Sequence, residues 1–211
     1  MTIPVTAKYK IELVAPGTER DKIPGVRIIA KFELKRGQKI TAALGQQPKF
    51  ALDGMNGSGG SFLVLESDKE RKLLLAAGGA GSSRHKNFGR GSTEGGLGKI
   101  KISGAGYRIE PDQLFGLIGC SAPKNYKNGL TGGIGHFFLN GSNNSWEKHE
   151  GGFGGGSTYY LTNVKYYWGA GGGFTGGTNG GGGGSFFADP DVELDHHYVE
   201  YGYCKIERID E

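Results

Sequence analysis

The chain has 211 residues, of which 36% are hydrophobic, 11% are aromatic and 42 are glycine, and its formal net charge is +4 at pH 7. That much apolar material can bury a core, so one folded domain is expected and a wholly disordered chain is excluded. The positive charges alternate with acidic residues along the chain. This balance predicts no nucleic-acid partner and no electrostatic attachment to a membrane.

Residues 1–25 carry no secretory signal. Lys or Glu interrupts each short apolar run, so this stretch contains neither a signal-peptide core nor a segment that could insert into a bilayer. On this basis we expect a cytoplasmic protein without membrane insertion. Cys120 and Cys204 are too few for a disulfide scaffold and lack the spacing of a zinc motif. They are either bridged to each other or free and buried.

Short β-branched and apolar runs, separated by turn residues, make up the chain before the glycine-rich part. We predict five strands there, over residues 9–15, 25–34, 38–45, 61–67 and 71–77. Apolar and charged residues alternate in residues 9–13 and 31–35, which is typical of strands with one buried face. Residues 197–209 alternate again and predict one long strand. Glycine interrupts every window that could form a helix, so little or no α-helix is expected.

Glycine is concentrated between residues 78 and 184, which hold thirty-three of the 42 glycines, against eight in residues 1–77. A flexible linker of this kind would be polar, whereas this segment also contains large rings such as Trp146, Phe153 and Trp168. Exposing those rings to water would be costly. We therefore expect an ordered insertion between strands of one sheet system.

A run of glycines makes a poor strand, because glycine has no side chain to pack and loses much entropy when it is ordered. The polyproline II helix suits it better, since its N–H and C=O groups point outward and helices without Cβ atoms can bond side by side. Gly57 is expected to be a turn glycine that tolerates substitution better than Gly182. The glycines expected in the interior of the bundle are Gly78, Gly79, Gly152, Gly154, Gly155, Gly172, Gly173, Gly182 and Gly183.

An ordered series of motifs extends over residues 8–209. It contains Leu44-Gly45-Gln46-Gln47, then Leu73-Leu74-Leu75-Ala76-Ala77-Gly78-Gly79-Ala80-Gly81, then the glycine tracts of residues 151–184, and finally Gly202-Tyr203-Cys204-Lys205-Ile206. This series resembles the glycine-rich domain of the receptor tyrosine kinases anaplastic lymphoma kinase and leukocyte tyrosine kinase, and of the wider family that shares it.

The resemblance implies a mostly β fold: a tumour-necrosis-factor-like β-sandwich of residues 1–77 and 185–211, with residues 78–184 inserted as a bundle of polyglycine II helices. It also implies a non-enzymatic domain that recognises a protein, which in those receptors is a cytokine outside the cell. The 211 residues contain no kinase domain and few cysteines, so the architecture is what we carry over. The family would place the chain outside the cell or at its surface, in contrast to the prediction from its N-terminal residues.

No complete catalytic motif is present. Residues 95–99 resemble a phosphate-binding loop, but its first glycine is missing and Ile100 stands where Ser or Thr is required. Residues 104–106 lack the third glycine of a dinucleotide-binding turn. The histidines are scattered and have no partner for nucleophilic catalysis. We expect a protein that is not an enzyme and has no cofactor.

Carboxylates alternate near the end of the chain, at Asp189, Asp191, Glu193 and Asp195. Such carboxylates can bind Ca²⁺, but the glycine that turns an EF-hand loop is absent. We therefore predict a solvated acidic loop there and no metal site.

The partner-binding site is predicted in the aromatic segment between two glycine tracts, at Tyr159, Tyr160, Tyr166, Tyr167 and Trp168. Tyr and Trp anchor protein interfaces at low entropic cost, although the same rings could instead cover the glycine bundle. The expected partner is a protein or the chain's own assembly. The alternative is a structural subunit of a cytoskeletal, ciliary or surface-coat assembly. An ice-binding protein ranks third, because no regular face of Thr or Ala is present.

Overall fold

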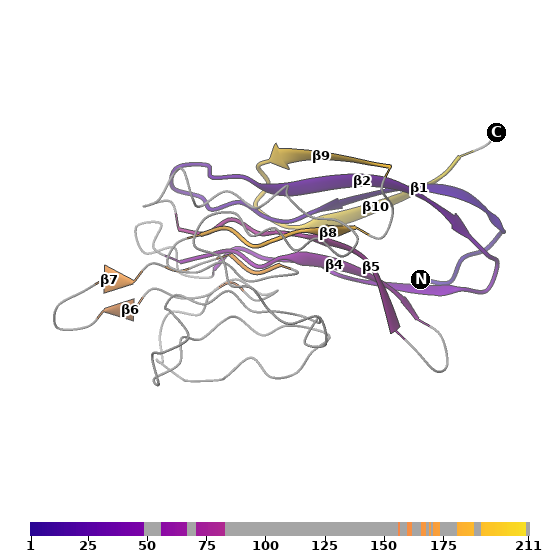
Figure 1. Ribbon diagram of the computed structural model, residues 1–211, viewed down its shortest axis with the longest axis horizontal. Helices are drawn as coiled ribbons and strands as arrows, with labels where there is room; N and C mark the ends of the chain where they lie inside the picture. The colour runs from indigo at the N-terminus through magenta and orange to yellow at the C-terminus, as the bar shows by residue number, and fades with distance from the viewer. Residues whose placement is uncertain are drawn as a thin grey trace.

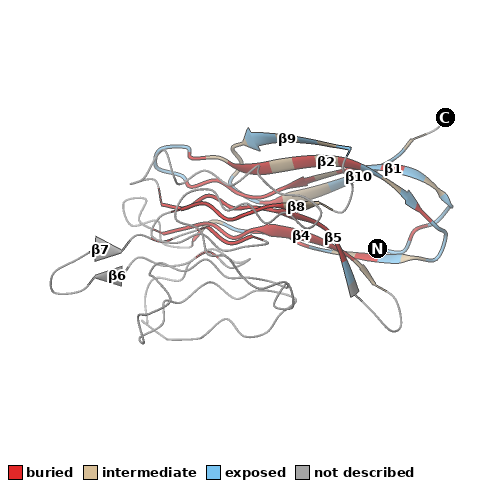
Figure 2. Ribbon diagram, viewed as in Figure 1, coloured by how far each residue is buried: buried red, intermediate tan, exposed pale blue. Residues whose placement is uncertain are grey.

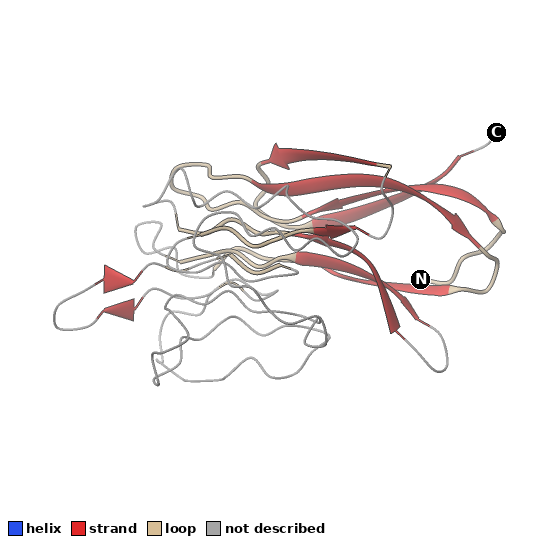
Figure 3. Ribbon diagram, in the orientation of Figure 1, coloured by secondary structure: helices blue, strands red, loops and turns tan. Residues whose placement is uncertain are grey.

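The computed structural model describes residues 1–48, 56–66, 71–82, 156, 160–161, 166–167, 169, 171–173, 181–187 and 191–209. Over these residues the chain is mostly β-structure without helix (Figure 3), so no membrane-spanning helix is found among them. The strands are β1 (Ala7–Val14), β2 (Gly25–Leu34), β3 (Lys39–Ala43), β4 (Ser61–Glu66), β5 (Arg71–Ala77), β6 (Tyr160–Leu161), β7 (Tyr166–Tyr167), β8 (Phe186–Phe187), β9 (Val192–His197) and β10 (Tyr203–Ile209).

The strands form two antiparallel four-stranded sheets and one separate pair. The first sheet has the order β10-β1-β2-β9, and the second sheet has the order β3-β4-β5-β8. β6 and β7 pair only with each other among the described strands. Figure 1 shows the two larger sheets as layers along the length of the molecule, which is the arrangement of a β-sandwich.

The main core lies between the two sheets. Ile11 of β1 and Ile28 of β2 belong to one buried cluster with Leu63 of β4 and Leu75 of β5, and each of these side chains is fully buried. Burying one side chain of this size stabilises the fold by about 1.5–3 kcal/mol. The strand period of two produces this layer, because every second residue of β1 points to the same face.

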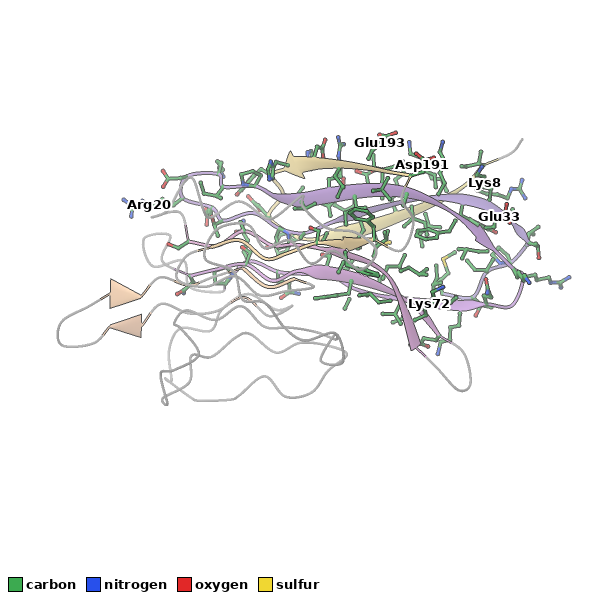
Figure 4. All side chains as sticks on the ribbon, in the orientation of Figure 1. Lys8, Arg20, Glu33, Lys72, Asp191 and Glu193 are labelled. Carbon is green, nitrogen blue, oxygen red and sulfur yellow. The ribbon has the colours of Figure 1, made fainter. Side chains whose placement is uncertain are left out.

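The two sheets differ on their outer faces. In the first sheet the outward positions are mostly charged, and Figure 4 shows Asp191 and Glu193 pointing away from the second sheet. In the second sheet Phe62 of β4 and Leu73 of β5 are buried in a separate cluster, although the neighbouring Leu63 belongs to the main core. The second sheet is therefore apolar on both faces, which explains why the sequence of β4 shows no alternation.

All five strands that the sequence predicts before residue 78 are confirmed, with ends within two residues of those expected. The prediction of one strand over residues 197–209 is wrong, because β9 ends at His197 and β10 begins at Tyr203. The chain bends between them, where Tyr201 forms an isolated bridge with Gln46. Pairing with a different part of the chain therefore interrupts an alternation that is continuous in the sequence.

The predicted acidic loop is also corrected, because residues 192–197 form β9. Val192 and Leu194 alternate with Glu193 and Asp195 and pack, partly buried, against the main core while β9 pairs with β2. The alternating carboxylates therefore lie on the solvent-exposed face of an edge strand. Asp189 lies outside the described residues.

Candidate functional site

Buried, glycine-rich backbone segments prolong the second sheet at one end. We call them the glycine lattice: residues 56–60, 78–82, 169, 171–173 and 181–185, all of which are buried. Residues 56–60 lead into β4, residues 78–82 follow β5 and residues 181–185 lead into β8. Figure 2 shows the buried path continuing from the strands into these segments. Three lattice segments are therefore direct continuations of sandwich strands.

Residues 78–82 lie at the centre of the lattice, because their backbone is hydrogen-bonded to six residues in other parts of the chain. A strand within a sheet has at most two neighbours, so the lattice is a three-dimensional array and not a sheet. The bonds are Ser58 N to Ala80 O (2.8 Å), Gly79 N to Gly172 O (2.8 Å), Ser82 N to Gly169 O (2.9 Å), Gly183 N to Gly79 O (2.9 Å), Ala80 N to Pro16 O (3.2 Å) and Val26 N to Gly78 O (3.0 Å).

The lattice has no room for side chains at its contacts. A Cβ atom on Gly78 would overlap the carbonyl oxygen of Gly183, and a Cβ on Gly183 would overlap that of Gly172. Neither Gly78 nor Gly183 has a positive φ angle, in contrast to Gly37 with a φ of 87°. Glycine is therefore needed in the lattice for the close approach of backbones and not for an unusual backbone conformation.

Serine hydroxyls satisfy backbone groups that the lattice would otherwise leave unpaired. The Ser58 hydroxyl donates to Gly17 O (2.6 Å), and the Ser185 hydroxyl accepts from Gly78 N (3.0 Å); both serines are buried. A buried backbone group without a partner is costly. These serines were not among the predicted site residues, although a lone Ser beside a glycine run is a signal that could have found them.

Six of the glycines predicted for the interior lie in the lattice, namely Gly78, Gly79, Gly172, Gly173, Gly182 and Gly183. Gly152, Gly154 and Gly155 lie outside the described residues. Gly57 does not lie in a turn as predicted, because it is buried in the lattice and its carbonyl oxygen would overlap a Cβ on Gly156. Its tolerance of substitution relative to Gly182 stays a prediction. Gly37 is a turn glycine instead, since a Cβ there would meet nothing within 4 Å.

The predicted partner-binding segment contributes the two-stranded antiparallel ribbon β6–β7. Tyr160 pairs with Tyr167, and Leu161 pairs with Tyr166. Figure 1 shows this ribbon at the opposite end of the molecule from the two chain termini. Tyr159 and Trp168 lie outside the described residues. Three of the five predicted positions are thus brought together on one ribbon.

Both flanks of the ribbon are attached to the lattice. Gly156 is buried, and a Cβ on it would meet the backbone of Gly57 and Ser58. Gly169 is buried as well and accepts a hydrogen bond from the Ser82 N–H. Gly156 and Gly169, the described glycines on either side of β6 and β7, therefore lie at closely packed positions, which fixes both flanks of the ribbon.

A second aromatic group lies in the loops that join the strands of the first sheet. Lys22 Nζ donates to the Tyr198 hydroxyl (3.1 Å) and lies 4.6 Å from the centre of the ring, and this hydrogen bond raises the pKa of Lys22. The neighbouring Tyr201 is 70% exposed. Lys22 and Tyr198 are 176 residues apart, so no local pattern in the sequence could have predicted their contact.

A chain of polar contacts crosses the outer face of the first sheet from edge to edge. The Tyr203 hydroxyl of β10 donates to Glu12 Oε1 of β1 (2.6 Å), and Arg27 Nη1 of β2 lies 3.9 Å from the same oxygen. Arg27 also donates two hydrogen bonds to Asp195 of β9. Its guanidinium lowers the pKa of Asp195, whereas burial, reinforced by the hydrogen bond to Glu12, raises the pKa of Tyr203 to about 12. These contacts tie both edge strands to the sheet.

The described residues place no three His, Cys, Asp or Glu side chains where they could hold a metal ion. Cys204 carries a free thiol whose pKa is raised by burial to about 11, so it is protonated at neutral pH and a poor nucleophile. Cys120 lies outside the described residues.

No model of a known protein family matches the chain, and no curated protein is significantly similar to it. What the protein does is therefore inferred from its own residues.

Proposed function

We propose that this chain is a non-enzymatic protein-binding module in which a rigid glycine bundle presents the ribbon β6–β7 to a protein partner. Its architecture is a tumour-necrosis-factor-like sandwich with inserted polyglycine II helices, as in the glycine-rich domains that the sequence resembles. The observation that carries the proposal is the close packing of two buried glycines that flank the ribbon: Gly156 against Gly57 and Ser58, and Gly169 bonded to the Ser82 N–H.

The polyglycine II helices of this proposal are the lattice segments. A polyproline II helix has three residues per turn and no internal hydrogen bonds, so its backbone groups point outward in several directions. The hydrogen bonds between residues 78–82 and six residues in other parts of the chain support this assignment. The overlap that a Cβ on Gly78 or Gly183 would make supports it too.

Hydrogen exchange tests the bundle independently of any partner. The amides of Gly79, Gly171 and Gly183 each donate a buried backbone hydrogen bond, so we expect them to exchange as slowly as core strand amides. The amide of Lys22, in an exposed turn of the first sheet, is the comparison. Exchange of the three glycine amides at the rate of a free peptide would overturn the bundle.

The aromatic residues of the ribbon are proposed to make the contact. Tyr and Trp provide a large contact area with only two side-chain torsions to restrain, and they are enriched among the residues that dominate binding energy. A loop whose base is already fixed loses less conformational entropy when it binds. The ribbon combines both properties, since Tyr160, Tyr166 and Tyr167 lie on one short hairpin between buried glycines.

Alanine variants compared by affinity capture test this contact. Tyr167→Ala is expected to remain folded and to lose the main partner, whereas Tyr201→Ala, which removes an exposed tyrosine elsewhere, is expected to keep it. Thermal unfolding checks the fold of both variants, and quantitative mass spectrometry measures the captured protein. Retention of every partner by Tyr167→Ala would move the contact to another surface, and unfolding of this variant would assign the ring to the core.

The alternative function is a structural subunit that uses the same rigid lattice within a larger assembly. The captured protein distinguishes the two. A substoichiometric partner supports recognition, and one abundant polymeric partner supports the structural role.

A further inference from the structure

The two edge strands of the first sheet are β10 and β9. Among the described strands, β10 pairs only with β1 and β9 pairs only with β2. The backbone N–H and C=O groups on the free side of an edge strand can pair with another chain. The first sheet can therefore be extended at either end, and the side chains decide at which one.

The neighbouring edge of the second sheet is closed. β2 packs over β5, and β1 packs over β4 and β5, so β10 lies on the side of β3. The N-terminal residues run along β3, where Ile40 N donates to Met1 O (2.9 Å) and Ile3 N donates to Gln38 O (2.8 Å). On this side of the sandwich, β10 is therefore the strand with a free edge among the described residues.

The outer face of β10 has a self-complementary order of side chains. Tyr203, Lys205, Glu207 and Ile209 alternate along it, while Ile206 points to the core and is partly buried. Lys205 Nζ lies 2.7 Å from Glu207 Oε1, and both side chains remain more than half exposed, at 58% and 51%. Both charges are thus accessible to a further strand.

We propose that two copies of this chain pair through β10, antiparallel, about a two-fold axis at Ile206. In this register Lys205 lies opposite Glu207 of the partner subunit, and Tyr203 lies opposite Ile209 of the partner subunit. The two-fold axis repeats both pairs. Opposite charges and aromatic–aliphatic neighbours are favourable cross-strand pairs, and the two first sheets become one continuous sheet.

The registers next to this one are unfavourable. A slip that moves the axis to Lys205 or to Glu207 places that charge opposite its own copy, and like charges directly opposite are destabilising. Registers between these would set outward side chains beside inward ones, because strand side chains alternate with a period of two. The axis at Ile206 also pairs the whole length of β10.

The opposite edge cannot pair with itself in this way. Antiparallel pairing of β9 about Leu194 would place Glu193 opposite Asp195 of the partner subunit, which sets like charges against each other. The contact through β10 is isologous, so it closes with two copies and does not grow into a filament. It does not involve the ribbon β6–β7, and it therefore stands or falls independently of the proposed function.

Charge reversal tests the dimer by sedimentation equilibrium over a range of concentrations. Wild-type protein is expected to be a dimer that dissociates on dilution. Lys205→Glu or Glu207→Lys alone places like charges opposite twice and is expected to raise the dissociation constant about ten-fold or more. An equimolar mixture of the two variants is expected to recover dimerisation. In a mixed dimer the two acidic side chains of one variant lie opposite the two lysines of the other.

The mixture distinguishes loss of the charge pair between subunits from destabilisation of the fold of each subunit. Lys205 also pairs with Glu12 of its own chain, but any destabilisation from that contact is unchanged by mixing. Glu193→Lys on β9 is the matched control and is expected to leave the dissociation constant unchanged. A monomeric wild type at all concentrations overturns the proposal. So does a mixture of the two variants that does not recover dimerisation.

A disulfide tests the register. In the proposed dimer Ile206 lies opposite Ile206 of the partner subunit, at a Cα separation of about 4.5–5.5 Å, which a disulfide can bridge. Ile206→Cys is expected to form a covalent dimer on oxidation, whereas Leu194→Cys on β9 is not. Equal cross-linking of both variants would overturn the assignment to β10.

Discussion

The sandwich and the glycine lattice are held together in opposite ways. In the sandwich, side chains such as Ile28 and Leu75 fill the space between two sheets. In the lattice, carbonyl oxygens of neighbouring segments occupy the space that a Cβ atom would need. The carbonyl oxygen of Gly183, for example, lies where a Cβ on Gly78 would be. The sandwich is therefore sensitive to the loss of side-chain volume, and the lattice is sensitive to its gain.

Packing through side chains changes to packing through backbone from one residue to the next. β5 ends at Ala77 and the lattice continues at Gly78; the lattice segment 181–185 ends at Ser185 and β8 begins at Phe186. Residue size at these junctions determines whether the chain packs through side chains or through backbone.

The largest effect is expected for a substitution inside the lattice. Gly183→Val would place a side chain against the backbone of Gly172. Backbone atoms cannot move aside by a change of rotamer, as a side chain could. We expect a loss of more than about 3 kcal/mol or failure to fold, since overpacking alone costs about 1–3 kcal/mol where side chains can adjust. Gly37→Ala, in an open turn with positive φ, is expected to cost only about 1 kcal/mol. Equal unfolding free energies for the two variants would contradict a lattice packed through its backbone.

A smaller but graded effect is expected in the sandwich core. Leu75→Ala removes fully buried volume between the sheets and is expected to lower the free energy of unfolding by about 2–5 kcal/mol. Leu75→Met, which conserves volume, is expected to cost less than about 1.5 kcal/mol. Denaturant titration of both variants measures the difference, and similar losses for both would show that volume does not govern this region.

The hydroxyl of Ser61 lies where the lattice segment 56–60 meets β4, so substituting it tests the junction of the two regions. Buried Ser61 donates to Val14 O (2.8 Å) and accepts from Gly45 N (2.9 Å). Ser61→Ala leaves both backbone groups without this partner and is expected to cost about 1–3 kcal/mol. Ser61→Cys retains a weak donor and acceptor and serves as the comparison in thermal unfolding. A neutral Ser61→Ala variant would show that these backbone groups find other partners.

Alkaline pH is expected to weaken the sandwich through β10. The pKa of Cys204 is raised to about 11 from an ordinary 9.0, and that of Tyr203 to about 12 from 10.0. Raised pKa values mean that the folded state holds its protons more tightly, so stability is complete below pH 9 and declines as the pH rises toward 12. Tyr203→Phe is expected to flatten the decline above pH 10 in denaturant titrations. An unchanged slope would show that Tyr203 does not contribute to it.

The smallest effect is expected for the pair of Arg27 and Asp195 on the outer face of the first sheet. The pKa of Asp195 is lowered from 3.8 by the Arg27 guanidinium, so its contribution is present above the unfolded value and is lost as the pH falls through the folded one. The Asp195 side chain is 47% exposed, which limits the contribution at neutral pH to about 1 kcal/mol or less. Asp195→Asn is expected to show this difference at pH 7 and to lose it as the pH falls through the pKa of folded Asp195.

The sequence by itself determined the sheet strands before residue 78, because apolar alternation and turn residues are local properties. β1 and β2 lie where the pattern of their own residues predicts them. It also determined that glycines such as Gly78 and Gly183 are interior residues, since a glycine run beside aromatic residues leaves backbone packing as the way to bury it. The division of the C-terminal alternation into β9 and β10, and the burial of Gly57, were decided only by the tertiary structure. The physical reason is that each depends on contacts between distant parts of the chain, Tyr201 with Gln46 and Gly57 with Gly156, and no local pattern encodes which distant backbone will arrive at a given residue.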